Sequence, residues 1–248
     1  MLNETDRARI AQLTAKDPEA AYVIRLLEED RREMLSLISH EIRNPLTLIN
    51  SSLQIIEKSH PEASGFRFWP QVKEDIRSLR LLLDDLSVYN NASALHRETV
   101  DLCTLVRDVT DSFLPELTFL GISLELPSKE SPASPALILG DPVKLRQVIV
   151  NLLKNAMEAL EETKSGCIRI SLTSDPGQIR LDIANNGPAI PPELQEEIFL
   201  PFRTYKPQGT GLGLPLCRRI IEAHGGTLTL RSSSQATVFT IFLPCSDT

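Results

Sequence analysis

Apolar residues recur every seven positions in the first part of the chain, and a second apolar set lies beside them on the same side of a helix. The two sets are Leu35, Ile42, Ile49 and Ile56, and Ile38, Leu46 and Leu53. This spacing is typical of a coiled-coil seam. It predicts one long helix over residues 19–58, beginning near Asp17 and Pro18. Pro45 lacks an N–H and clashes with the carbonyl group four residues back, so we expect the helix to bend or loosen there.

A second helical pattern follows the turn-forming residues 60–65. Its apolar positions alternate at spacings of three and four, and they are Trp69, Val72, Ile76, Leu79, Leu83 and Leu86. Two amphipathic helices joined by a short turn predict an antiparallel hairpin. Each apolar stripe is too broad for the other helix alone to cover. We therefore expect two hairpins to pair as a four-helix bundle in a homodimer.

From about residue 96 the pattern becomes a mixture of helices and strands. Helices are predicted at 102–119, 141–162 and 214–223, and strands at 122–126, 136–139, 167–173, 178–184, 227–231 and 237–243. A hairpin turn is expected around Asp175-Pro176-Gly177, and a loop at 127–135. The predicted fold class is α+β. It has a helical lead-in over residues 1–24, a dimerising hairpin over 25–95 and an α/β domain over 96–248.

Composition limits which binding partners and which cellular compartment we expect for this chain. The 248 residues carry a formal net charge of −7, which argues against nucleic acid or an anionic membrane as the main partner. The four cysteines form no CxxC pair, as expected of reduced thiols in the cytoplasm. No apolar run reaches membrane-spanning length and the first residues are polar. We expect a cytoplasmic chain without a membrane segment, so that any membrane sensor would lie outside it.

The most distinctive motif is His40-Glu41-Ile42-Arg43-Asn44-Pro45. His40 falls five positions after Leu35, on the opposite side of the helix, and Asn44 shares the face of His40 four residues further on. The sequence therefore predicts a solvent-exposed imidazole on a rigid helix, beside a carboxylate and an amide. The other histidines occur in turn or boundary contexts, where we expect ordinary surface positions; they are His60, His96 and His224.

Two asparagines share one face of the predicted helix 141–162, in the run Asn151-Leu152-Leu153-Lys154-Asn155. Amide oxygens suit Mg²⁺, which takes oxygen ligands octahedrally together with waters and phosphate oxygens. Asparagine is a poor helix former, so two in one helix indicate a specific purpose. A solvated polar face would give the same spacing.

Three further motifs follow in order. Asn185-Asn186-Gly187-Pro188-Ala189 comes directly after a predicted strand. Residues 198–206 contain two phenylalanines, which core packing alone would also explain, and end at Lys206. Gly209-Thr210-Gly211-Leu212-Gly213-Leu214 opens a predicted helix. There glycines let the backbone approach phosphate groups, and the helix N–H groups bind anions.

In this order and spacing, the motifs resemble the H, N, G1, F and G2 boxes of the sensor histidine kinases of two-component systems, over roughly residues 25–244. The phenylalanine-rich F-box, with the glycine turn close behind, is most similar to that of nitrogen-regulatory and sporulation-type kinases. The resemblance implies a phosphoacceptor hairpin followed by an α/β sandwich of the kind shared with gyrase-type and chaperone-type ATPases. It also implies ATP and Mg²⁺, and a response-regulator receiver domain as partner.

The resemblance implies a role for each motif residue. His40 would take the γ-phosphoryl group of ATP and pass it to a regulator aspartate, with Glu41 accepting a proton. Asn44 would orient a water for phosphatase activity toward the regulator, unless it only solvates the kink at Pro45. Asn155 and Asn151 would hold Mg²⁺. The remaining nucleotide-binding residues would be Lys154, Asn185, Gly187, Lys206, Gly209, Thr210, Gly211, Leu212 and Gly213, with Arg203 as an alternative cation.

The chain departs from the family pattern at Asn185, where the kinases carry an aspartate that accepts a hydrogen bond from the adenine amino group. The amide oxygen can accept that bond without the charge, so we predict ATP binding weakened by about 1 kcal/mol. Asp182 should face the other side of its strand and not replace it. Ala189 stands where the box has its second glycine.

Two other functions fit some of these motifs. One is a degenerate kinase that dimerises and docks a regulator but barely phosphorylates itself, which Asn185 would favour. The other is a different ATPase of the same superfamily, which uses ATP to gate dimerisation. The histidine motif on its own helical hairpin argues against the second alternative.

Overall fold

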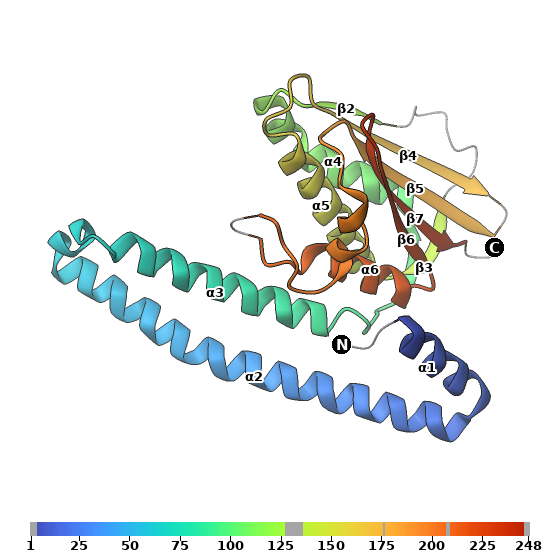
Figure 1. Ribbon diagram of the computed structural model, residues 1–248, viewed down its shortest axis with the longest axis horizontal. Coiled ribbons are helices and arrows are strands. Elements are labelled where there is room, and N and C mark those ends of the chain that lie inside the picture. Colours follow the sequence, from blue (N-terminus) through green and yellow to red (C-terminus); the bar gives the residue numbers. More distant parts are fainter. Residues whose placement is uncertain (1–3, 127–135, 176, 207–208, 246–248) are drawn as a thin grey trace. The chain divides into compact units, whose positions relative to one another are not determined.

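The computed structural model describes residues 4–126, 136–175, 177–206 and 209–245. The chain divides into two compact units, Met1–Asn91 and Ala92–Thr248. Figure 1 shows the first as helices and the second as a sheet with helices against it. The expected loop at 127–135 and Pro176 of the expected turn lie outside the described residues.

The first unit consists of helices α1 (Glu4–Lys16), α2 (Pro18–Ser59) and α3 (Trp69–Asn90), with a short 3-10 helix at Pro61–Gly65. The carboxylate of Asp17 caps α2 by accepting hydrogen bonds from the backbone N–H groups of Glu19 and Ala20, at 2.9 and 3.2 Å. The two predicted helices of the hairpin are thus confirmed, and α2 continues through Pro45. No helix of the described residues is long and apolar enough to cross a membrane.

Helices α2 and α3 pack through only part of the predicted apolar seam. Ser39 and Leu46 are buried on α2, and Ile76 and Leu83 are buried on α3. Six other apolar residues of the two stripes are 40 to 47% exposed; they are Ile38, Ile42, Ile49, Ile56, Val72 and Leu79. These six residues, here called the apolar face, lie to one side of the buried positions on both helices. The seam is therefore not fully buried within one chain.

The second unit is a two-layer α/β sandwich. Its five-stranded sheet has the order β2-β4-β5-β7-β6, in which β2 is parallel to β4 and the other pairs are antiparallel. The strands are β2 (Ser123–Glu125), β4 (Cys167–Asp175), β5 (Gln178–Asn185), β6 (Thr227–Ser232) and β7 (Thr237–Pro244). Helices α4 (Leu102–Phe119), α5 (Pro142–Ala159) and α6 (Gly213–Ala223) lie along one face of it in Figure 1.

Alternation along the strands explains this layering. Every second residue of the three central strands is buried against the helices; these residues are Ile168, Ile170, Leu172, Ile179, Leu181, Ile183, Phe239, Ile241 and Leu243. Helix α5 supplies Val148, Leu152 and Ala156 from its own buried face. The predicted α+β class is confirmed, and each predicted strand is present with both ends within two residues of the prediction.

Three details differ from the sequence-based expectation. A short strand β1 (Glu98–Asp101) was not predicted, and it pairs antiparallel with β3 (Leu137–Gly140). Helix α5 ends at Ala159 instead of residue 162. His60 and His96 are exposed as expected, but the surface position predicted for His224 is wrong.

His224 is buried at the end of α6. Its Nε2 accepts a hydrogen bond from the backbone N–H of Asp141 at 2.9 Å, and its Nδ1 donates to the carbonyl of Ile220 at 2.7 Å. Gly140 leaves room for the ring, since a Cβ there would lie 2.9 Å from His224 Cδ2. The imidazole therefore joins the end of α6 to the start of α5.

Candidate active site

His40 lies exposed on α2, next to a buried residue. Ser39 is 1% exposed and its hydroxyl donates to the carbonyl of Leu35 at 2.7 Å, whereas the next residue along the helix, His40, is exposed. Glu41 and Asn44 are exposed as well. One turn after His40, the guanidinium of Arg43 forms an ion pair with Asp84 at 2.9 Å and ties α2 to α3. The predicted exposed imidazole is thus present on a braced helix.

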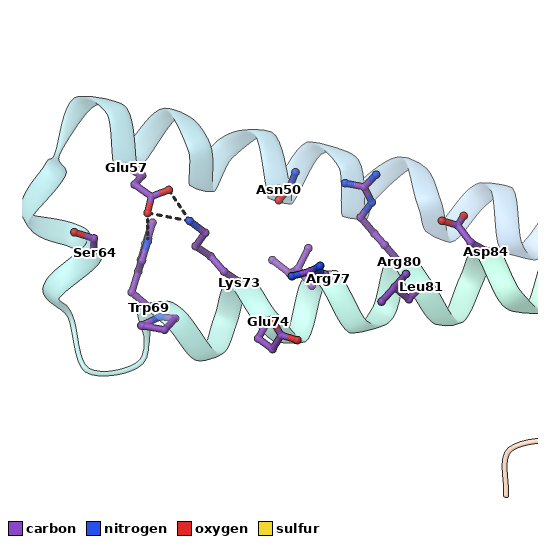
Figure 2. A pocket seen from close by; sticks show the side chains of 12 residues that line it. Asn50, Glu57, Ser64, Trp69, Lys73, Glu74, Arg77, Arg80, Leu81 and Asp84 are labelled. Atoms are coloured by element: carbon purple, nitrogen blue, oxygen red, sulfur yellow. Dashed lines mark hydrogen bonds and ion pairs between the residues drawn. The ribbon is translucent and has the colours of Figure 1, made fainter. Parts of the chain in front are cut away.

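A charged groove of about 690 Å³ lies between α2 and α3. Figure 2 shows the Lys73 ammonium group donating to both carboxylate oxygens of Glu57, and the Trp69 indole N–H donating to the same carboxylate. The groove is also lined by Asn50, Arg77, Arg80 and Asp84. The hairpin therefore has one charged side and one apolar face.

The second unit contains a cavity of about 810 Å³. Nine of the predicted residues line it; they are Asn151, Lys154, Asn155, Asn185, Lys206, Gly209, Thr210, Gly211 and Gly213. The two other predicted residues of this group, Gly187 and Leu212, are buried and do not line it. Motifs far apart in the sequence thus meet around one cavity, which has a charged end and an apolar end.

At the charged end, a lysine and an asparagine are in direct contact. Asn155 Oδ1 accepts a hydrogen bond from Lys206 Nζ at 2.9 Å, and the same ammonium group pairs with the carboxylate of Glu158. Glu158 was not predicted, although its position three residues after Asn155 places it on the same helix face. An amide oxygen and a carboxylate that already hold one cation form a donor set that suits Mg²⁺.

Asn151 lies one turn earlier on α5, half-buried between the cavity and α6. Burial raises the pKa of the Cys217 thiol on α6 to about 12, while a hydrogen bond with the Asn151 side chain acts in the opposite direction. The thiol therefore stays protonated at neutral pH. Asn151 is partly engaged in helix packing. Among the described residues, Asn155 is hydrogen-bonded by Lys206 alone, so it is the better candidate ligand.

The glycine turn enters α6 through a conformation that needs glycine. Gly211 has φ +68°, and a Cβ there would lie 2.8 Å from the backbone N of Arg203. The backbone N–H of Phe202 donates to the carbonyl of Gly211 at 3.0 Å, which fastens the turn to the preceding segment. No side chain of the described residues caps the start of α6. Its first N–H groups are available to an anion such as phosphate.

The two phenylalanines of the predicted F-box behave differently. Phe199 is buried and packs edge to face on Phe239, with ring centroids 6.4 Å apart, and the guanidinium of Arg218 lies 3.9 Å above its ring. Phe202 is exposed, with φ +64°. Core packing therefore explains the first ring but not the second.

At the apolar end, Asn185 is 4% exposed at the end of β5. Its Oδ1 accepts a hydrogen bond from the backbone N–H of Gly187 at 3.0 Å. Asp182 instead accepts from Thr240 at 2.6 Å, pairs with Arg180, and does not line the cavity. This confirms that Asp182 does not replace Asn185. The apolar lining includes Ala159, Ile190, Leu194, Ile198 and Phe239.

Comparisons with known proteins match both units. The family model of the His Kinase A (phospho-acceptor) domain matches residues 30–95. That of the histidine kinase-, DNA gyrase B- and HSP90-like ATPases matches residues 140–247. The fold and its cavity thus define an ATP-binding domain joined to a phosphoacceptor hairpin.

Individual relatives agree with these matches. Sporulation kinase C of Bacillus subtilis (strain 168) is 31% identical over 213 residues, covering 86% of this chain and 48% of that protein. The sensory histidine kinase/phosphatase NtrB of Escherichia coli O157:H7 is 28% identical over 233 residues, covering 86% and 62%. The chain therefore spans about half to two thirds of the length of these two relatives.

Solved structures of the histidine kinase ThkA are also similar. Its catalytic domain is 34% identical with a TM-score of 0.55, covering 60% of this chain and 96% of that one. Its complex with the response regulator TrrA gives 27% identity and a TM-score of 0.62, covering 90% and 66%. The chain belongs to the sensor histidine kinases, of the nitrogen-regulatory and sporulation type.

Proposed function

We propose that this chain phosphorylates itself on His40 with ATP and passes the phosphoryl group to an aspartate of a response regulator. The observation that carries the proposal is an exposed His40 next to Glu41, in one chain with a nucleotide-sized cavity that ends at an uncapped helix. The complex of ThkA with TrrA supports the kind of partner.

In the first step, one ring nitrogen of His40 attacks the γ-phosphorus in line. The new N–P bond forms as the bond between the γ-phosphorus and the bridging oxygen breaks, and ADP leaves with that electron pair. The carboxylate of Glu41 accepts the proton from the other ring nitrogen. In the second step, a carboxylate oxygen of the regulator aspartate bonds to the phosphorus as the N–P bond breaks. The ring nitrogen keeps that electron pair, and Glu41 returns the proton to the imidazole.

The second unit binds the triphosphate through its charged end. The backbone of residues 209–213 and the N-terminus of α6 hold the phosphate oxygens, and Lys206 neutralises their charge. Asn155, with Asn151 beside it, is the site for Mg²⁺, which supplies further charge neutralisation when bound. Lys206 gives up its contact with Asn155 to allow this, and Lys154 lies at the rim of the same cavity.

We further propose that two chains pair through the apolar face to form a four-helix bundle. Its six residues run along both helices of the hairpin, with 40 to 47% of each exposed in a single chain. Burying such a stripe stabilises association by about 25 cal/mol per Å². The charged groove lies on the other side of the hairpin and would stay accessible.

Asn44 favours phosphatase activity toward the phosphorylated regulator as a second function. Its amide is exposed four residues after His40, on the same side of α2, where it can hydrogen-bond a water. We expect Asn44→Ala to slow dephosphorylation of a phosphorylated regulator by this chain while label still accumulates on His40. Equal rates of dephosphorylation by the unaltered chain and by Asn44→Ala would contradict a role of Asn44 in phosphatase activity.

The kinase proposal is tested with γ-labelled ATP. The chain and its His96→Gln variant, which changes another exposed histidine, should both become labelled. The His40→Gln variant should remain unlabelled, although it should still bind nucleotide. Label on His40→Gln at the rate of the unaltered chain would contradict the proposal.

A further inference from the structure

Asn185 is a buried polar side chain that borders the apolar end of the nucleotide cavity. The charged end is marked by Asn155, and Ala159 lies one helical turn later on α5. The carbonyl of Ala159 would lie 2.8 Å from a Cβ on Gly187, so the backbone after β5 is packed tightly against the end of α5. The proposed binding mode puts the phosphates of the nucleotide at the uncapped start of α6. The base then occupies the apolar end of the cavity, where Asn185 faces the polar edge of the base.

The orientation of the Asn185 amide is fixed by its neighbour. The backbone N–H of Gly187 can only donate, and it points at Oδ1 at 3.0 Å. The opposite orientation would set the amide NH₂ group against that N–H, two donors facing each other in a buried place. Oδ1 is therefore the amide atom that faces Gly187, and Nδ2 is the other terminal atom of the side chain.

The Nδ2 group is a donor in need of an acceptor. Among the residues that the structure describes, none accepts a hydrogen bond from it. An aspartate in the same orientation would present an acceptor oxygen there instead. One residue thus decides whether the base meets a donor or an acceptor at this end of the cavity.

Purine bases differ in what they offer at position 6. Adenine carries an amino group, which donates, whereas hypoxanthine and guanine carry a carbonyl oxygen, which accepts. We propose that Asn185 widens the nucleotide specificity of this site, so that 6-oxopurine nucleotides bind at least as tightly as adenine nucleotides and serve as phosphoryl donors alongside ATP. The inference rests on the proposed binding of a nucleotide in this cavity.

The test compares dissociation constants of ADP and IDP, measured by calorimetry on the full chain. Hypoxanthine, the base of IDP, lacks the 2-amino group of guanine. IDP therefore differs from ADP only in the group at position 6 and in the proton on the neighbouring N1. The expected ratio of the IDP constant to the ADP constant is one or less. In Asn185→Asp the ratio should rise by at least about tenfold, because a carboxylate accepts from the amino group of adenine and repels a carbonyl oxygen. Asn91→Asp, the same chemical change at an exposed residue that does not line the cavity, should leave the ratio unchanged.

A second readout is phosphorylation with γ-labelled GTP, which should label the chain and fail to label Asn185→Asp under the same conditions. An IDP-to-ADP ratio above about three in the unaltered chain, or a change below about threefold in Asn185→Asp, overturns the inference and leaves the kinase proposal standing. Failure of every nucleotide to bind overturns both.

Discussion

The side-chain oxygen of Asn155 on α5 accepts a hydrogen bond from Lys206 Nζ at 2.9 Å. Lys206 belongs to the segment before the glycine turn, and its ammonium group also pairs with Glu158. The residue proposed to neutralise phosphate charge thus contacts the Asn155 oxygen atom proposed to hold the metal ion. Nucleotide and metal binding would release this contact and redirect the lysine toward the phosphates.

The first prediction concerns Lys206→Ala. We expect autophosphorylation to slow by about 10²-fold, because a positioned charge that meets the transferring phosphoryl group is lost. Thermal stability should change little, since the contacts of this exposed side chain are screened by water. Single-turnover kinetics with γ-labelled ATP measure the rate. Lys164→Ala, an exposed lysine outside the cavity, is the control, and an equal effect in both variants would contradict the assigned role.

A second prediction separates two glycines of the same turn. Gly211→Ala should lower the free energy of unfolding by about 1–3 kcal/mol, because Gly211 has φ +68° and a Cβ would clash with Phe202 and Arg203. Gly213→Ala should be close to neutral, because a Cβ there meets nothing within 4 Å. Urea unfolding of both variants measures the difference. Equal costs would mean that the backbone at Gly211 is not as described.

The third prediction is a pH dependence from His224. Burial lowers the pKa of this imidazole below its ordinary value of 6.5. The unfolded chain therefore binds a proton at a higher pH than the folded chain does. Stability from this group is full above about pH 6.5. It is lost as the pH falls toward the lowered pKa, by up to about 1.4 kcal/mol per pH unit.

Urea unfolding at several pH values between 7 and 5 measures this slope. His224→Gln keeps an acceptor for the N–H of Asp141 but does not titrate, so the slope in this window should flatten. His96→Gln, at an exposed histidine, should keep the slope of the unaltered chain. An unchanged slope in His224→Gln would show that other groups cause it.

A fourth prediction tests the apolar face. Ile49→Glu places a carboxylate where a second hairpin is expected, so dimer dissociation constants should rise by about 100-fold or more. Leu48→Glu is the matched control, because Leu48 is 70% exposed and its side chain points away from the apolar face. Sedimentation equilibrium measures both. A dimer that survives Ile49→Glu, or dissociates equally in Leu48→Glu, would contradict pairing through this face.

The sequence predicted the elements well because most carry strong periodic patterns. The helix at 102–119 matches α4 at both ends, and Asp101 caps it by accepting from the N–H of Cys103 at 3.0 Å. Strand β1 was missed because its sequence, Glu98-Thr99-Val100-Asp101, has a single apolar residue and so shows no alternation. Its place is set by pairing with β3, which is a tertiary effect.

The site was predicted less completely, for reasons of packing. A histidine before two glycines looks like a surface helix end, yet His224 is buried because Gly140 leaves space for its ring. Glu158 had a usable signal in its spacing from Asn155. Nothing in the sequence indicated that Lys206 would reach it. The orientation of the Asn185 amide follows from one backbone N–H group, which is visible only once the turn at Gly187 is built.

The central claim is that His40 takes a phosphoryl group from a nucleotide held near Asn155. The most direct measurement is mass-spectrometric mapping of the chain after incubation with ATP and Mg²⁺, kept at alkaline pH to preserve phosphohistidine. We predict phosphate on His40 in the unaltered chain and none in Asn155→Ala, which removes the proposed metal ligand. Phosphate on Ser39 or Thr47 instead, or equal phosphorylation of His40 in Asn155→Ala, would contradict the account.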